Sequence, residues 1–358
     1  MSPFLEMNGV RYSLDRLDEA LRAAPAPFYA DAIQFCRDWI TQRDQFTFQT
    51  SGSTGTPKQI SFTRSQLIAS AHLSAEALNL QAGENALVCL DTRLIAGAMM
   101  LVRSMVTGMN IILEQPSANP VQLDQTAIHF VALVPYQVVS MLQSRAPRLQ
   151  QIKTVIIGGA PLQATTVDAL KTFTNQIYAT YGMTETITHI ALQPLSGKTP
   201  QQHFHALNTV SLSTDNRECL VIRAPHLGQT PIITNDRVQL IDDKTFAWLG
   251  RIDRVINSGG KKIQAEYIEE VVESLMDNLG LNNRFFVAGL RDPLLGESVT
   301  LFVEGQLTED MKTQLHQALG HKLSRYEIPK SIICLERFTE TASQKVDRIS
   351  TIRNTQKK

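Results

Sequence analysis

A short polar segment in the first part of the chain carries the clearest chemical signal. The run 50–58 reads TSGSTGTPK, so glycines, hydroxyl side chains and a lysine stand together directly after the strand-like segment 46–48. Glycines let the backbone turn its N–H groups toward oxygen atoms, hydroxyls add donors, and an ammonium group adds positive charge. This density favours a phosphate-binding loop over a plain surface turn. The residues expected to contact phosphate are Thr50, Ser51, Gly52, Ser53, Thr54, Gly55 and Lys58.

This loop differs from the phosphate loop of the P-loop nucleotidases. Their pattern is GxxxxGK[ST], whereas Lys58 here follows a proline and precedes Gln59.

Strands and helices alternate on the C-terminal side of the loop. Short apolar, β-branched runs predict strands, and the longer segments between them predict helices. Such alternation is typical of a largely parallel sheet covered on both faces, with ligands at the carboxyl ends of its strands. The expected strands are 86–90, 110–113, 130–134, 154–157 and 177–180, and the expected helices are 65–78, 95–106, 136–142 and 164–173.

The pattern changes after Pro194. Short strands joined by turn residues (219–223, 237–241 and 246–249) predict an antiparallel subdomain. A compact α+β unit follows, with helices expected at 265–276 and 309–323 and strands at 285–290, 299–303 and 331–335. We expect an α/β fold with a large N-terminal domain (1–252) and a small, mobile C-terminal domain (253–358), joined at a hinge near 250–254.

Composition excludes several classes of function. The 34 basic side chains equal the 34 acidic ones, so net charge gives no reason to expect a nucleic-acid or anionic-membrane partner. The four cysteines have no metal-ligand spacing, and no apolar run approaches the ~20 residues of a membrane span. We expect a cytoplasmic protein with reduced cysteines.

Five segments in sequence order resemble the motifs of the adenylate-forming superfamily, which includes acyl-CoA synthetases, luciferases and the adenylation domains of nonribosomal peptide synthetases. The first is the loop 50–58. The others are 181–185 (YGMTE), 234–236 (TND), 250–260 (GRIDRVINSGG) and 341–348 (TASQKVDR). They extend over nearly the whole chain, and such an order makes coincidence a poor explanation.

The resemblance implies a role for each motif in binding ATP with Mg²⁺. Tyr181 would offer an aromatic face to adenine, and Thr184 would donate its hydroxyl to the α-phosphate. Glu185 would give a hard oxygen ligand to Mg²⁺, which offsets its repulsion by polyphosphate. Asp236 would accept hydrogen bonds from both ribose hydroxyls, supported by Arg251. The run Gly158, Gly159 and Ala160 resembles an adenine-lining loop, although a strand-to-helix turn explains it almost as well.

Lys345 is the residue expected to catalyse the first half-reaction. Negative charge gathers on oxygen atoms as a carboxylate attacks the α-phosphorus of ATP, and an aligned ammonium group stabilises it. The alternative is a surface lysine in a basic tail. Gln344 stands where the family usually has glycine. This difference affects the expected backbone shape of the loop, whereas the positive charge of Lys345 is still present.

The resemblance also implies a second half-reaction, in which the thiol of coenzyme A attacks the acyl-adenylate. The small domain rotates between the two steps in this family, and Asp253 stands at the pivot position. Gly259 and Gly260 would pass close to the pantetheine arm.

The segments 181–189 and 248–260 most closely resemble those of o-succinylbenzoate-CoA ligases of menaquinone biosynthesis. Such a substrate has a second carboxylate, which needs a polar or cationic partner in the acyl pocket. His189 and Arg93 are the candidates. A structural histidine and a helix-capping arginine are the alternatives for these two residues.

Two other readings of the whole chain stay open. Only 49 residues precede Thr50, fewer than the family usually has, and residues 94–97 (LIAG) lack a histidine common in relatives. One alternative is a ligase for another aryl or acyl acid, delivering to CoA or to a carrier protein. The other is a catalytically dead nucleotide-binding relative, for which the short N-terminal region and Gln344 are the signals. A homodimer is implied by the family alone.

We predict that Lys345→Ala abolishes acyl-adenylate formation but still permits thioester formation from supplied acyl-adenylate, since the charge is needed only at the α-phosphate. Assaying each half-reaction separately checks this. Equal loss of both half-reactions would refute the division of labour.

Overall fold

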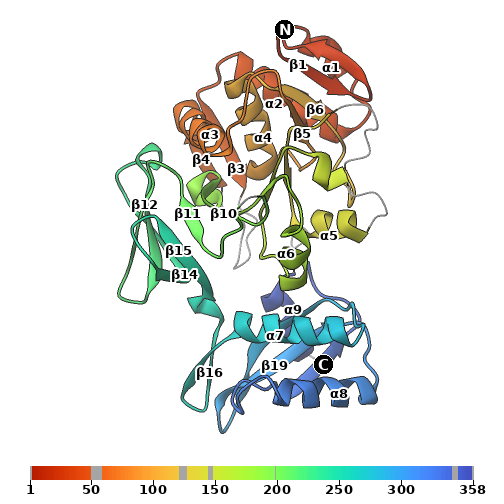
Figure 1. Cartoon of the computed structure of the whole chain (residues 1–358), viewed down its shortest axis with the longest axis vertical. Helices are drawn as coiled ribbons and strands as arrows, with labels where there is room; N and C mark the ends of the chain where they lie inside the picture. The colour runs from red at the N-terminus through yellow and green to blue at the C-terminus, as the bar shows by residue number, and fades with distance from the viewer. Residues whose placement is uncertain are drawn as a thin grey trace.

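The computed structural model describes residues 2–49, 59–120, 127–143, 148–197, 199–340 and 346–356. Figure 1 shows a large part built from residues up to about 250 and a smaller part formed by the remaining chain. Each part has a β-sheet of its own.

The larger sheet is centred on parallel strands that are buried on both faces. Strands β5 (Asn85–Val88), β6 (Asn110–Leu113), β7 (Phe130–Leu133) and β8 (Thr154–Ile157) are short apolar runs in the order β8-β7-β5-β6. β-branched and aliphatic residues on both sides of a strand favour this covered position. Strand β9 (Gln176–Gly182) extends the parallel pairing beyond β8. The prediction of a covered, largely parallel sheet is confirmed here.

Helices pack on both faces of these strands (Figure 1). Neighbouring residues of one strand point to opposite faces: Val88 belongs to the cluster that includes α2 (Pro27–Ile40) and α4 (Ile95–Thr107), whereas Leu87 packs with α5 (Pro135–Gln143) and α6 (Ala164–Leu170). The elements of the N-terminal region are β1 (Phe4–Met7), β2 (Val10–Ser13), α1 (Leu17–Arg22), β3 (Gln45–Gln49), β4 (Gln59–Thr63), α3 (Arg64–Leu78) and the 3₁₀ turn η1 (Arg148–Gln151).

The antiparallel strands continue the parallel sheet instead of forming a sheet of their own. Strand β10 (His189–Pro194) pairs antiparallel with β9, and the order then runs β10-β11-β15-β14-β13-β12. The reason is local: β9 and β10 are joined by the short segment 183–188, so the next strand of the chain fills the free edge of β9. These strands are β11 (Phe204–Ala206), β12 (Ser211–Thr214), β13 (Cys219–Arg223), β14 (Ile232–Leu240) and β15 (Thr245–Arg251), with the 3₁₀ turn η3 (Pro225–Leu227) before β14.

The C-terminal part is a second sheet with helices. Strand β19 (Gly296–Glu304) lies at its centre, pairing with β18 (Phe285–Asp292) and, in parallel, with β20 (Ser331–Leu335). Leu301 faces a cluster formed with α7 (Ala265–Asn278), whereas Phe302 stacks on Phe286 on the other face. The remaining elements are η4 (Ile252–Arg254), β16 (Val255–Ser258), β17 (Lys261–Gln264), α8 (Glu309–Gly320) and α9 (Arg348–Gln356).

The last strand of the large sheet ends at Arg251 and the first strand of the small sheet begins at Val255. The division into a large domain (1–252) and a mobile small domain (253–358) stays a prediction.

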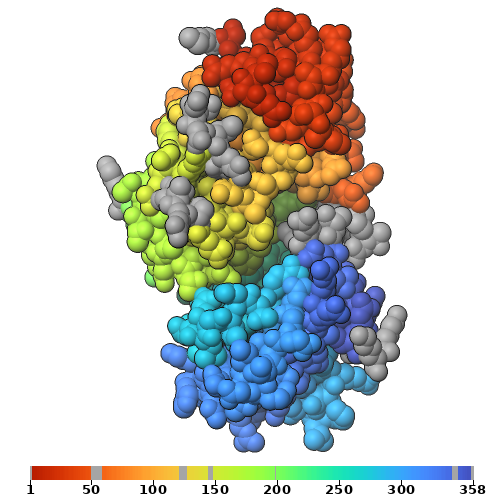
Figure 2. Space-filling model, turned by 90° about the vertical axis from the view of Figure 1, so that its right-hand side faces the viewer, coloured from red at the N-terminus to blue at the C-terminus, as the bar shows by residue number. Residues whose placement is uncertain are grey.

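The two parts meet where α6 packs against α7, and Figure 2 shows their atoms in direct contact. The Thr165 hydroxyl donates to Asp277 at 3.2 Å, and Glu273 hydrogen-bonds to Gln163. Burial, reinforced by the charges of Asp277, Glu269 and Glu270, raises the pKa of Glu273 to about 7. This carboxyl is therefore easier to bury as the neutral acid.

We predict that Glu273→Gln stabilises the protein at pH 8 and not at pH 5. The pKa of Glu273 in the fold lies above its ordinary value of 4.5, so the cost of the buried charge appears as the pH rises from about 4.5 to about 7. Glutamine carries no charge at either pH. Scanning calorimetry should show the transition rise by about 3 °C at pH 8 only. A matched control is Glu336→Gln at an exposed position, and an unchanged transition for Glu273→Gln at pH 8 would contradict the assignment.

Candidate functional site

A strained turn presents Thr184 and Glu185 at the end of β9. The turn η2 (Thr184–Thr186) is followed by Ile187 with φ 68° and ψ −60°, and the Thr188 N–H donates to the Thr186 carbonyl at 2.7 Å. This is a γ-turn of the rare form, in a region that a β-branched residue seldom adopts. Strain of this kind, of order 1–3 kcal/mol, clusters at functional sites.

The strain is held by packing and by a hydroxyl. Ile187 is fully buried in a cluster with residues of β3, β4, α3 and α4. The Thr186 hydroxyl contacts the backbone of Met183 and Thr188 on either side of the turn. Gly182 is required before it, because a Cβ there would lie 2.5 Å from the Thr188 carbonyl oxygen. Glu185 is left exposed at the tip.

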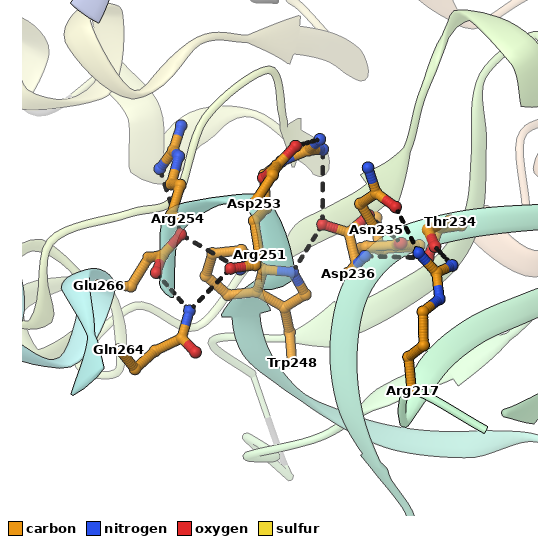
Figure 3. Close-up of polar contacts among 11 residues, drawn as sticks. Arg217, Thr234, Asn235, Asp236, Trp248, Arg251, Asp253, Arg254, Gln264 and Glu266 are labelled. Carbon is orange, nitrogen blue, oxygen red and sulfur yellow. Dashed lines mark hydrogen bonds and ion pairs between the residues drawn. The ribbon is translucent and has the colours of Figure 1, made fainter. Parts of the chain in front are cut away.

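Asp236 lies on β14 and is surrounded by donors (Figure 3). The Tyr181 hydroxyl donates to its Oδ2 at 2.7 Å, and Trp248 Nε1 donates to its Oδ1 at 3.2 Å. Arg251 approaches the same Oδ1 at 3.9 Å. Burial and then the Asp236 charge raise the pKa of Tyr181, which keeps its hydroxyl a donor. The structure thus brings together Tyr181, Asp236 and Arg251 from three strands.

The predicted hinge segment, 250–254, is bonded to the start of α7. Arg251 makes a bidentate ion pair with Asp253, with bonds of 2.9 and 2.6 Å. Its backbone N–H donates to Glu266 and its carbonyl accepts from Gln264 (Figure 3). Gly250 has φ 118°, and a Cβ on it would lie 2.4 Å from Gln264 Nε2. One arginine therefore stands between the Asp236 carboxylate and the predicted pivot.

The glycines at 158–159 and at 259–260 are each required by the local backbone. Gly259 and Gly260 form the two-residue loop between β16 and β17, both with positive φ (56° and 77°), as a type I′ turn requires. Gly158 follows β8, and a Cβ on it would meet Thr180 Oγ1 at 2.3 Å. Gly159 has φ 91° and Ala160 follows it. Their contacts with adenine and pantetheine stay predictions.

The predicted phosphate loop and the predicted catalytic lysine lie outside the described residues. For the loop, the described neighbours are the ends of a hairpin, with Gln49 of β3 opposite Gln59 of β4. For the lysine, Glu340 and Val346 form a bridge on either side of the segment. The residues concerned are Thr50, Ser51, Gly52, Ser53, Thr54, Gly55, Lys58 and Lys345.

A buried cation lies behind the strained turn. Arg103 on α4 is 1% exposed and donates to the Thr188 hydroxyl at 2.5 Å, while its Nε has no partner. No acidic side chain among the described residues pairs with it. Burial lowers its pKa to about 10, so it remains cationic at neutral pH. This arginine is not among the candidates from the sequence; the available signal is a single charge within the otherwise apolar helix Ile95–Thr107.

His189 is also buried, close enough to Arg103 to feel its charge. Its side chain is 5% exposed, and its Nε2 has no hydrogen-bond partner. Burial and the charge of Arg103 hold the pKa of His189 well below its usual range, so the ring is neutral. The other candidate, Arg93, lies elsewhere: it is largely exposed and forms a bidentate pair with Asp91. It lacks the burial that a closed acyl pocket needs.

The site offers one carboxylate suited to Mg²⁺. Glu185 is exposed, with no hydrogen bond or ion pair to another described side chain, so its oxygens suit a cation that keeps most ligands from water and phosphate. Within the described residues, no three His, Cys, Asp or Glu side chains gather to hold a metal ion unaided. In the same part of the chain, every helix is too short or too polar to cross a bilayer.

Comparison with known proteins shows which family the chain resembles. A model of the AMP-binding enzyme family matches residues 37–245. The 2-succinylbenzoate–CoA ligase of Bacillus cytotoxicus is 26% identical over 335 residues, which cover 84% of this chain and 68% of that protein. Its counterpart from Listeria monocytogenes is 24% identical over 343 residues, covering 87% and 70%.

Solved structures agree with this placement. An acyl-CoA synthetase (AMP-forming)/AMP-acid ligase II-like protein from Dyadobacter fermentans is 35% identical, with 92% of this chain and 95% of that chain covered and a TM-score of 0.61. The o-succinylbenzoate coenzyme A synthetase of Bacillus subtilis, in complex with ATP and magnesium ion, is 20% identical and has a TM-score of 0.72 over 86% of this chain and 69% of that one. The chain belongs to the AMP-binding enzyme family of AMP-forming acyl-CoA ligases.

Proposed function

We propose that the protein adenylates o-succinylbenzoate with ATP and transfers the acyl group to coenzyme A, as a cytoplasmic enzyme of menaquinone biosynthesis. The names of the curated relatives support this substrate. The observation that carries the proposal is the buried, unpaired Arg103 beside the neutral His189.

Arg103 is costly to bury without an acidic partner. An isolated buried charge is destabilising by several kcal/mol, and such groups are normally paired or bound to a ligand. A substrate with two carboxylates supplies the partner: one reacts with ATP, and the other pairs with Arg103. The unpartnered Nε2 of His189 adds a hydrogen-bonding group nearby. A monocarboxylic acid would leave the cation unpaired.

In the first half-reaction, the free carboxylate of the acid attacks the α-phosphorus of ATP, and pyrophosphate leaves. Lys345 and Thr184 stabilise the charge on the α-phosphate oxygens, and residues 50–58 hold the phosphates. Glu185 would hold Mg²⁺, which would neutralise charge on the phosphates. Asp236 holds the ribose, while Tyr181 and the loop 158–160 line the adenine.

In the second half-reaction, the thiol of coenzyme A loses its proton and attacks the acyl carbonyl, and AMP leaves. The segment 258–260 borders the path of the pantetheine arm. Rotation at Asp253 exchanges the two faces of the small domain between the steps. The ion pair of Asp253 with Arg251 is a contact that this rotation must reorganise.

The test is an assay of AMP release and thioester formation by the purified protein with ATP, Mg²⁺, coenzyme A and a panel of acids. AMP and o-succinylbenzoyl-CoA forming together would support the proposal. Turnover only with another aryl or fatty acid, or only with a carrier protein, would keep the ligase and discard the pathway. ATP binding without AMP release would favour a dead relative.

We predict that Arg103→Met lowers kcat/KM for o-succinylbenzoate by about 100-fold or more, since the second carboxylate loses its buried partner. With benzoate-like monocarboxylic acids the variant should match or exceed the wild type. Its thermal transition should not fall, because methionine suits an apolar site. Steady-state kinetics with both acids checks this. If Arg93→Met carried the selective loss instead, the assignment of the cation would be reversed.

A further inference from the structure

Trp248 contacts the proposed ribose site, and neither the motifs nor the comparisons give it a role. It lies on β15, half buried, with its ring packed against the core of the large sheet. Its indole N–H donates to Asp236 Oδ1 at 3.2 Å (Figure 3). An indole nitrogen can only donate, so this contact holds Oδ1 as an acceptor and fixes one orientation of the carboxyl group.

An irregularity in the sheet makes this contact possible. Asp236 is opposite Arg251 and Arg237 opposite Gly250, but Val238 is opposite Trp248, so Leu249 is an extra residue on β15. Opposite residues of paired strands point to the same face, and such a bulge resets the alternation. Trp248 and Arg251, three positions apart, therefore both face the Asp236 carboxylate. A regular strand would turn one of them away.

The two donors fix the carboxylate from different sides. Tyr181 donates to Oδ2 and Trp248 to Oδ1, while Asp236 is only 6% exposed. Each carboxylate oxygen has about two acceptor positions, so one on each stays available. Two adjacent acceptors in a fixed plane match the two hydroxyls of a ribose.

We propose that Trp248 is a positioning residue, which orients Asp236 to accept from a ribose diol and so makes the protein select ribonucleotides over deoxyribonucleotides. The inference rests on the proposed function only in placing ATP at Asp236. Trp248 itself touches neither the acid nor the reacting phosphate in this role.

Calorimetric titration with ATP, 2′-deoxyATP and 3′-deoxyATP, in Mg²⁺ and without acid or coenzyme A, tests this. The wild type should bind at least one deoxynucleotide about tenfold more weakly than ATP. In Trp248→Phe, ATP binding should weaken about tenfold, while binding of that deoxynucleotide changes less than about twofold. Trp39→Phe is the matched control: Trp39 is buried on α2 beneath Arg64, and its loss should leave the preference unchanged.

Tyr181→Phe gives a second variant, which removes only the other donor and keeps the aromatic ring. It should reduce the same preference, so the inference stays testable if Trp248→Phe does not fold. A parallel loss of affinity for ATP and deoxynucleotides in both variants would overturn the inference, because general disorder acts on every nucleotide. A wild type without a preference for ribose would also overturn it. Ribose selection without AMP release in the activity assay would support the inference and reject the proposed function.

Discussion

The site depends on one strand that pairs in two directions. Strand β9 hydrogen-bonds in parallel to β8 and antiparallel to β10. The parallel edge brings the loop after β8 beside it, and the antiparallel edge begins the run of strands that carries Asp236 and Arg251. The turn between β9 and β10 lies where the two halves of the sheet join. Without this change of direction, Tyr181 and Asp236 would not meet.

Much of the fold follows from residue patterns. The runs around Ala86, Ile111, Val131 and Val155 are apolar on both sides, and all became parallel strands covered by helices. Helices 164–173 and 309–323 were predicted too long, ending instead at Leu170 and Gly320. The hydrophobic pattern alone locates the ends of helices poorly, because the same residue types also occur in the turns that follow them. The continuity of the antiparallel strands with the parallel sheet also escaped prediction, since strand order is not encoded locally.

The site was predictable only where a motif carried it. The structure brings Tyr181, Asp236 and Arg251 together, and their roles toward the nucleotide stay predictions. The hydroxyl contact of Tyr181 with Asp236 is not predicted by the motifs. Arg103 and Trp248 were missed for a physical reason. Their roles arise from burial and from a bulge, and both depend on pairing between distant segments. Of the two predicted carboxylate partners, His189 is buried near Arg103, whereas Arg93 is exposed.

The backbone at Ile187 ties the geometry of the turn that presents Thr184 and Glu185 to the packing beneath it. Its positive φ is held by the apolar neighbours that enclose the side chain, including Met99 and Phe48, together with the Thr186 hydroxyl. Any loosening of that enclosure lets the loop relax to an ordinary conformation, while the hydrogen bonds of the sheet remain intact. We therefore expect this turn to lose its conformation at a lower temperature than the sheet unfolds. The presentation of Thr184 and Glu185 would then be lost before the rest of the fold and would return on cooling.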